Sequence, residues 1–125
     1  MDELLVSAFE PVARDLRAAG LECELVEDSS GLPDGLLRGD LVVSGVKLGH
    51  VHLDPALEMA RRIQTLADFV QDLVLENVRN SGRTIEWPPC LPSHVHPMSA
   101  GEFGGVARWY CPLDPSIAVN IGAHP

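Results

Sequence analysis

The sequence predicts an α+β fold in which a helix, three strands and a second helix precede a short C-terminal ribbon-like β appendage. Apolar residues recur at helical spacing near the N terminus and again over residues 55–79, and they alternate with polar residues in between. Seven of the ten prolines lie in residues 88–125, which excludes a mainly helical C-terminal segment. A chain of 125 residues is long enough to form a core of its own.

The first helix is predicted from an apolar stripe at 4-3-4-3 spacing, formed by Leu5, Phe9, Val12, Leu16 and Ala19. Gly20 follows as a natural C-terminal stop. Pro11 leaves two alternatives open. The helix begins near Ser7, where Ser7 and Glu10 would form a capping box, or it runs from Asp2 and is kinked at Pro11.

Three strands are predicted over residues 21–27, 36–43 and 46–53, where apolar and polar residues alternate. Ser44 and Gly45 fit a tight hairpin turn between the second and the third strand. We expect one three-stranded antiparallel sheet with both helices on one face.

The second helix is the best-marked element, with Asp54 as its expected N-cap and Pro55 in its first turn. Ile63, Leu66 and Val70 fall on its apolar stripe and are expected to be buried. A helix over residues 55–79 would be roughly 37 Å long, more than a small sheet can cover. Part of it would therefore pack against another chain or against the C-terminal segment.

The composition changes at Trp87, which divides the chain into two predicted units. Residues 1–82 form the α+β domain, and residues 83–125 form a compact Pro/Gly-rich appendage with short strands at 106–111 and 116–121.

The appendage carries residues of the types that bind zinc: Cys90, His94, His96 and Cys111. Thiolate and imidazole suit tetrahedral zinc, and a structural zinc would organise a segment too small for a core. The spacing departs from the usual Cys-x2-Cys knuckle, with Asp114 as a substitute oxygen ligand. The alternative is a metal-free, Pro-rich cap in which both cysteines are small buried apolar groups.

The motifs W-P-P-C, H-V-H-P and W-Y-C-P, followed by a short apolar strand ending in Gly, resemble the C-terminal part of small uncharacterised actinobacterial proteins. The resemblance covers about residues 66–122 and implies a zinc-ribbon-like module over residues 83–125, with no activity assigned. It points to the four residues above and to two tryptophans, Trp87 and Trp109. Leu91, inserted between Cys90 and Pro92, departs from the pattern.

No residue pattern predicts an enzyme. His50 and His52 would face one side of a strand, and Asp54 would complete a His-x-His-x-Asp set. Asp54 is already explained as a helix cap, so we expect two solvent-facing histidines. Ser44 lacks a nucleophile elbow, Cys23 is expected in the core, and the glycines match no phosphate-binding loop.

The charge excludes further classes of function. The chain has 9 basic and 18 acidic residues, and ten of the acids lie in the first forty residues. A net charge of −9 would repel the phosphates of nucleic acids and anionic membranes. The acidic start Met1-Asp2-Glu3 is unlike a secretory signal and predicts a cytoplasmic protein.

We therefore expect a non-enzymatic structural or interaction module, such as an adaptor or an oligomer subunit, with a protein partner or a second copy and a structural zinc. Trp87, Trp109 and Tyr110 are the predicted partner-binding residues, although these rings fit equally well as the appendage's own core. Two alternatives remain open: a phage virion component such as a head–tail or tail-end ring subunit, and an acidic immunity or inhibitor protein that binds a basic partner. A metallohydrolase is a third option, which would need an open position on the metal.

Overall fold

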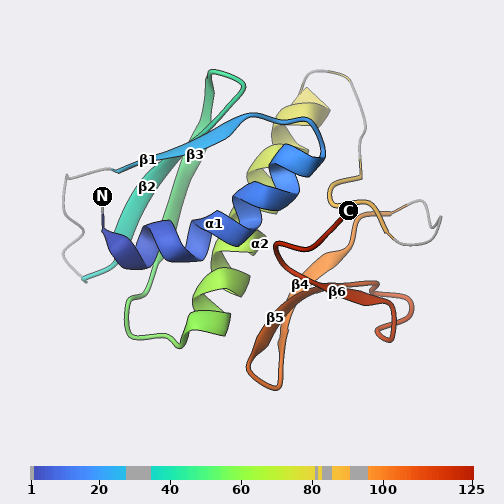
Figure 1. Ribbon diagram of the computed structural model, residues 1–125. Helices are drawn as coiled ribbons and strands as arrows, with labels where there is room; N and C mark the ends of the chain where they lie inside the picture. The colour runs from blue at the N-terminus through green and yellow to red at the C-terminus, as the bar shows by residue number, and fades with distance from the viewer. Residues whose placement is uncertain (1, 28–34, 81, 83–85, 91–95) are drawn as a thin grey trace.

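The computed structural model describes residues 2–27, 35–80, 82, 86–90 and 96–125, and it confirms the predicted α+β class (Figure 1). Along the chain the elements are α1 (Glu3–Ala18), β1 (Cys23–Glu27), β2 (Leu37–Val43), β3 (Val46–Leu53), α2 (Met59–Asn80), β4 (Ser99–Phe103), β5 (Val106–Tyr110) and β6 (Ala118–Asn120).

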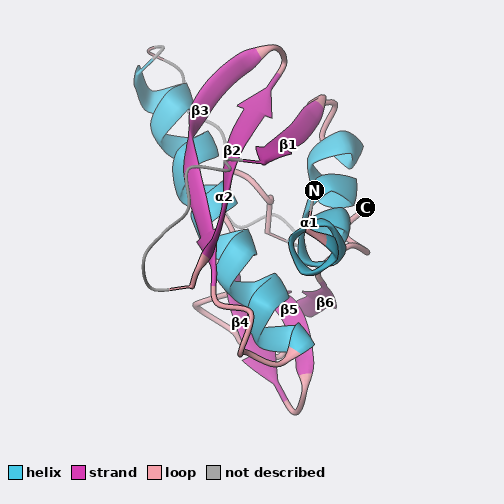
Figure 2. Ribbon diagram, turned by 90° about the vertical axis from the view of Figure 1, so that its left-hand side faces the viewer, coloured by secondary structure: helices cyan, strands magenta, loops and turns pink. Residues whose placement is uncertain are grey.

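The first sheet is antiparallel with the strand order β1-β2-β3, and one of its faces meets both helices (Figure 2). Leu41 pairs with Leu25 on one side and with Gly49 on the other, so these residues share a face. A Cβ on Gly49 would lie 2.7 Å from Leu73 of α2, and Cys23 of the same face approaches α1. The expected arrangement of the sheet and the two helices is therefore present.

Helix α1 begins immediately after Asp2, whose Oδ1 accepts a hydrogen bond of 2.8 Å from the Leu4 amide. This is the second of the two alternatives for its start, and Pro11 lies inside the helix. The C-terminal segment passes close to this proline, because a Cβ on Gly122 would lie 2.9 Å from the Pro11 Cβ.

Helix α2 begins at Met59 rather than at residue 55, so the predicted start was wrong. The Asp54 carboxylate accepts from the Ala56 amide at 2.9 Å, and its carbonyl accepts from the Leu57 amide at 3.3 Å. These bonds close a turn over residues 54–57 that competes with helix formation. Asp54 is consequently a turn residue and not the helix cap.

The second sheet is antiparallel with the order β4-β5-β6. Strands β5 and β6 are shorter than predicted, and β4 was not predicted because Ser99-Ala-Gly101 has low strand propensity. Gly101 is covered by aromatic rings, since a Cβ there would lie 2.8 Å from Phe103 and 3.0 Å from Tyr110. Those rings stack edge to face at 5.4 Å.

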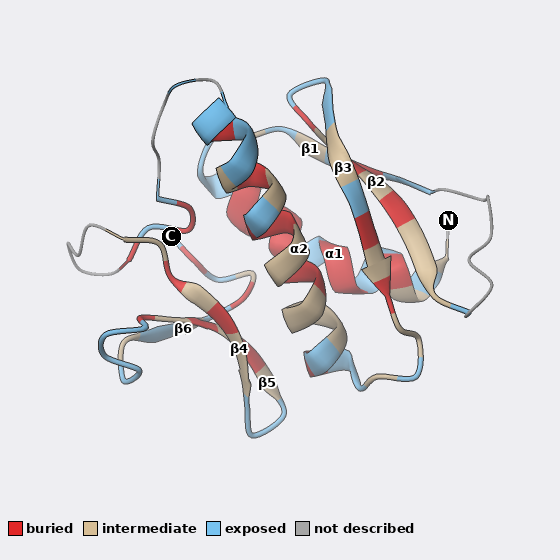
Figure 3. Cartoon of the chain, turned by 180° about the vertical axis from the view of Figure 1, so that it is seen from behind, coloured by how far each residue is buried: buried red, intermediate tan, exposed pale blue. Residues whose placement is uncertain are grey.

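Helix α2 lies between the two sheets, and its buried side faces a core that both parts of the chain share (Figure 3). Trp87 and Trp109 belong to the same apolar cluster as Leu66 of α2. The C-terminal segment thus covers the length of α2 that the first sheet leaves free. Whether residues 1–82 and 83–125 fold as separate domains stays a prediction.

A buried carboxylate joins α1 to the C-terminal segment. Asp15, only 3% exposed, accepts from the Trp109 indole at 2.7 Å, the Gly122 amide at 2.7 Å and the His124 amide at 3.0 Å. The Trp87 indole donates to the Asp15 carbonyl at 3.4 Å. Four donors from distant residues therefore converge on one residue of α1.

The core position of α2 gives the first prediction. Leu66 is fully buried, whereas Ile63, which we expected to be buried, is only partly so. Leu66→Ala is expected to lower the free energy of unfolding by about 2–5 kcal/mol because it leaves a cavity. Ile63→Ala should cost less, since part of its side chain is already in water. Urea denaturation measures both, and equal losses would contradict this assignment of the buried face.

A second prediction concerns the buried carboxylate. Asp15→Ala leaves three N–H donors without their acceptor, so unfolding free energy should fall by at least about 3 kcal/mol. Glu10→Ala is the matched control on the exposed side of α1, where its ion pairs with Arg14 and Arg17 are 3.8 Å long. Its cost should stay within about 0.5 kcal/mol. Similar losses in both variants would show that the hydrogen bonds to Asp15 contribute little.

Candidate metal centre

Three of the predicted ligands come together in the structure. One ligand atom each from Cys90, His96 and Cys111 lies within 4.8 Å of the other two. The Cys111 Sγ and the His96 Nε2 are 3.7 Å apart. In a tetrahedral zinc site, bond lengths of about 2.3 Å to sulfur and about 2.1 Å to nitrogen separate neighbouring ligand atoms by roughly 3.6 Å. The separation of His96 Nε2 and Cys111 Sγ therefore matches that of two zinc ligands.

Short antiparallel contacts place Cys90 beside His96. Pro89 forms an isolated β-bridge with Pro97, and the Met98 amide donates to the Pro88 carbonyl at 2.9 Å. Prolines lack an amide hydrogen, so this pairing cannot extend into a regular ladder. The two ligands consequently stand at the end of a very short pair of extended segments.

Cys111 arrives from the second sheet, directly after β5. Its amide donates to the Ile117 carbonyl at 2.9 Å, and its carbonyl accepts from the Asp114 amide at 3.2 Å. These bonds make a tight turn that fixes the backbone on both sides of the sulfur.

Two side chains tie the Cys90 and His96 segments to the rest of the protein. The Gln71 amide of α2 donates to the Trp87 carbonyl at 3.2 Å and to the Met98 carbonyl at 2.5 Å. From the C-terminal end, the His124 Nε2 donates to the Pro89 carbonyl at 2.7 Å. The residues flanking both ligands are therefore anchored from two sides.

The imidazole of His96 is held in the form that binds metal. Its Nδ1 lies 2.9 Å from the Pro97 carbonyl oxygen, which can only accept a hydrogen bond. In the neutral ring Nδ1 then carries the proton, and the lone pair of Nε2 faces Cys111. Metal-binding histidines are commonly oriented by such a bond from the second ring nitrogen.

The electrostatics of the group favour a cation. Burial raises the pKa of the Cys90 thiol above its ordinary value, and the neighbouring Cys111 sulfur raises it further. Both cysteines are buried, whereas His96 is partly exposed. Two thiolates so close together repel each other, and a bound divalent cation would remove that repulsion.

The other predicted ligands of this centre are not part of the observed group. His94 lies outside the described residues. Asp114, the substitute oxygen ligand, accepts from the Ser116 amide at 3.2 Å and from its hydroxyl at 2.6 Å, and it is absent from the metal-binding group.

His50 and His52 do not form a second centre. The His50 ring binds Asp40, which also lies 3.3 Å from the Lys47 ammonium. The hydrogen bond from His50 is the main cause that lowers the pKa of Asp40 below its ordinary value. The His52 ring packs against Phe69 instead. Within the described residues, Cys90, His96 and Cys111 are the one such group found.

The predicted partner-binding aromatic residues occupy different environments. Trp87 is 2% exposed and Trp109 is fully buried, and their rings meet edge to face at 5.4 Å. This is the core role that the sequence left open for both. Tyr110 is partly exposed and packs on Phe103.

No protein-family model, curated protein or solved structure matches the chain. The resemblance of residues 66–122 to actinobacterial proteins therefore stays a prediction. Among the described helices, none is long and apolar enough to cross a membrane.

The raised pKa of Cys90 gives a pH prediction. Zinc must displace the thiol proton, and the raised pKa of Cys90 keeps that proton bound to higher pH, so zinc affinity should rise with pH up to the raised pKa and fall as pH drops below it. In metal-free protein, the contribution of this thiol to folding stability changes with pH in the opposite direction and falls as pH rises. The folded state keeps the proton longer, so the stabilising contribution is present below the thiol's unfolded pKa and is lost as pH rises towards the folded pKa.

Competition titration with a zinc chelator at several pH values measures this dependence. Cys23→Ser is the matched control, because burial also raises the Cys23 pKa but its sulfur lies 3.9 Å from the Ala13 carbonyl, away from the centre. The slope should be unchanged in this variant. A zinc affinity that does not vary with pH in the unmodified chain would contradict thiolate ligation.

Proposed function

We propose that the chain is a non-enzymatic interaction module whose C-terminal segment is held in place by one structural zinc. The ligands would be Cys90, His96 and Cys111, with His94 as the predicted fourth. The observation that carries the proposal is the convergence of the three ligand atoms within 4.8 Å of one another.

The ligand set favours a structural role over a catalytic one. Two thiolates and one or two imidazoles are typical of closed structural zinc sites, and both sulfurs are buried. The ion would join the end of β5 to the residues on either side of 91–95, next to the Pro89–Pro97 bridge and the β4–β5 pairing. Zinc binding would add one further cross-link to the hydrogen bonds that already connect these segments.

The proposed partner is a protein or a second copy of the chain. A net charge of −9 disfavours nucleic acid and anionic membranes. The three cysteines are thiols and not disulfides, which suits a reducing compartment such as the cytoplasm. An acidic inhibitor of a basic protein is the second candidate, favoured by the exposed Glu22, Glu24 and Glu27 at and beside β1.

Elemental analysis of purified protein tests the metal. About one zinc per chain is expected for a single tetrahedral site. Cys90→Ser and Cys111→Ser should each remove most of it, because each deletes a thiolate ligand. Cys23→Ser and the double variant His50→Ala/His52→Ala are the matched controls and should retain the zinc, since these residues lie outside the group.

Limited proteolysis with and without a chelator tests the role of the metal. Chelation should increase the rate of cleavage within residues 83–125, while the helices and the first sheet stay protected. Zinc-free protein with full resistance to protease and unchanged unfolding in chelator would overturn the proposal. The metal-free, Pro-rich cap would then be the correct interpretation of the C-terminal segment.

A further inference from the structure

An apolar groove of about 500 Å³ opens at the end of the first sheet that is close to the C-terminal end of α2. Its walls come from the β2–β3 hairpin, from α2 and from the Trp87–Pro89 segment. Apolar side chains dominate the lining: Leu21, Val43, Val46, Leu48, Val74 and Val78. Val46 is 55% exposed, so the groove presents apolar surface to solvent.

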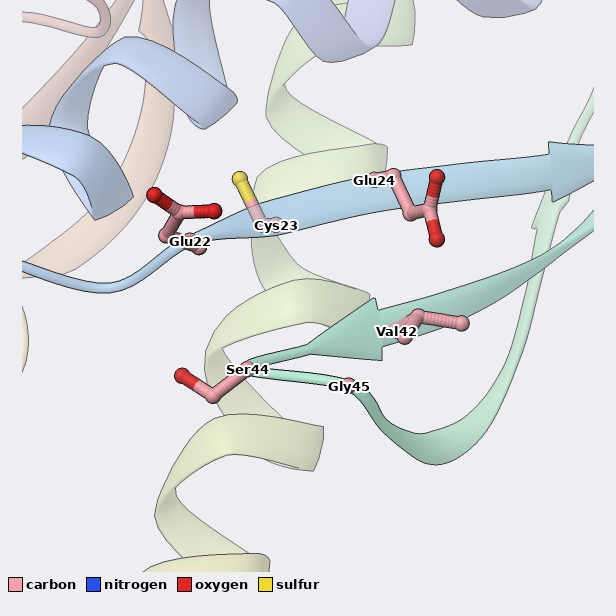
Figure 4. Close-up of a pocket in the computed structure, with 6 residues that line it drawn as sticks. All are labelled: Glu22, Cys23, Glu24, Val42, Ser44 and Gly45. Carbon is pink, nitrogen blue, oxygen red and sulfur yellow. The ribbon is translucent and has the colours of Figure 1, made fainter.

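A second hollow of about 370 Å³ shares Ser44 with this groove. Figure 4 shows the residues that line the second hollow. It lies between the ends of β1 and β2, and Glu22 and Glu24 supply its charge. The Ser44 amide donates to the Glu22 carbonyl at 2.8 Å, which fixes the boundary between the two hollows. Glu86 adds a third carboxylate on the groove side, and no Lys or Arg is among the described residues that line either hollow.

We propose that the two hollows form one docking site for a basic, amphipathic segment of another protein. Apolar side chains of the segment would enter the groove, and Arg or Lys beside them would face Glu22 and Glu24. The inference rests on the interaction role in the proposed function and does not require the metal. Apolar burial would provide affinity, and the carboxylates would select basic partners.

The charge of the chain argues against a second copy as the occupant. Leu113 is the most exposed of the large apolar side chains described, at 75%, and Asp114 follows it. Phe103, at 42%, is preceded by Glu102. Either anchor would bring a further carboxylate towards Glu22 and Glu24, in a chain with a net charge of −9.

The test uses the full chain and a short synthetic peptide of Leu and Arg with the leucines at helical spacing. Fluorescence titration should show binding that weakens as salt rises, because the carboxylate contacts are screened. Val46→Asp should weaken binding at least about tenfold, since a charge enters the apolar groove. Val26→Asp is the matched control: Val26 is 45% exposed, lies on β1 and lines neither hollow.

A double variant, Glu22→Gln/Glu24→Gln, tests the role of charge by removing both carboxylates of the second hollow. This variant should lose most of the salt dependence while keeping its thermal unfolding midpoint. A peptide with Glu in place of Arg should not bind. Equal binding by Val46→Asp and Val26→Asp would overturn the site, because only the first alters the groove.

Two further results would overturn the choice of occupant. Octylammonium that binds as tightly as the peptide and competes with it would assign the groove to a small organic cation. A dimer in light scattering that Val46→Asp dissociates would assign it to a second copy. Zinc analysis of the same samples separates the proposals: zinc-free protein that still binds the peptide refutes the metal centre alone, and zinc-loaded protein that does not bind it refutes the docking site alone.

Discussion

The buried carboxylate of Asp15 is the constraint on which the arrangement of the C-terminal half depends. A charge taken out of water is costly unless hydrogen-bond donors replace the lost solvation. Here the donors are the Trp109 indole and the amides of Gly122 and His124, all more than ninety residues away in the sequence. Apolar packing alone is non-directional and would allow the second sheet to slide on the helices. The three bonds select one position, and that position brings β5, with Cys111 at its end, to the other two ligands.

A second polar anchor acts from the opposite helix. The Gln71 side chain of α2 donates to the carbonyls of Trp87 and Met98, while the Trp87 indole donates to the Asp15 carbonyl of α1. Trp87 is thus fixed between the two helices by one bond to α1 and one to α2, inside an otherwise apolar cluster. Such satisfied polar groups specify a unique packing in a core. The candidate metal centre lies at the margin of this network, next to backbone that the network already holds.

Local patterns predicted most of the fold, and contacts between distant residues account for what they missed. The helices and the hairpin at Ser44 follow from periodicity and turn chemistry within a few residues. The pairing of His50 with Asp40 was missed because a two-residue turn with regular register would place residue 49 opposite Asp40, and a bulge next to Leu41 shifts the register by one. The burial of Asp15 could not be predicted from the local sequence either. An acidic residue beside an apolar stripe normally faces water, and the donors to the Asp15 carboxylate lie in the last seventeen residues.

The ligand types of the metal centre were predictable, but their selection was not. The residue types alone predicted Cys90, His96 and Cys111 as ligands. Their spacing along the chain does not match a zinc knuckle, because the knuckle pattern requires both ligands of a pair to lie in one turn. In the structure the pairs belong to different segments: an isolated bridge brings Cys90 to His96, and the second sheet brings Cys111 to both. Sequence spacing then carries no information about the distance between ligand atoms. What positions them is the set of hydrogen bonds from Gln71 and His124 to the neighbouring backbone. A zinc ion would therefore bind a site that the polar core has already brought close to its final geometry, so that little ordering of the chain opposes binding.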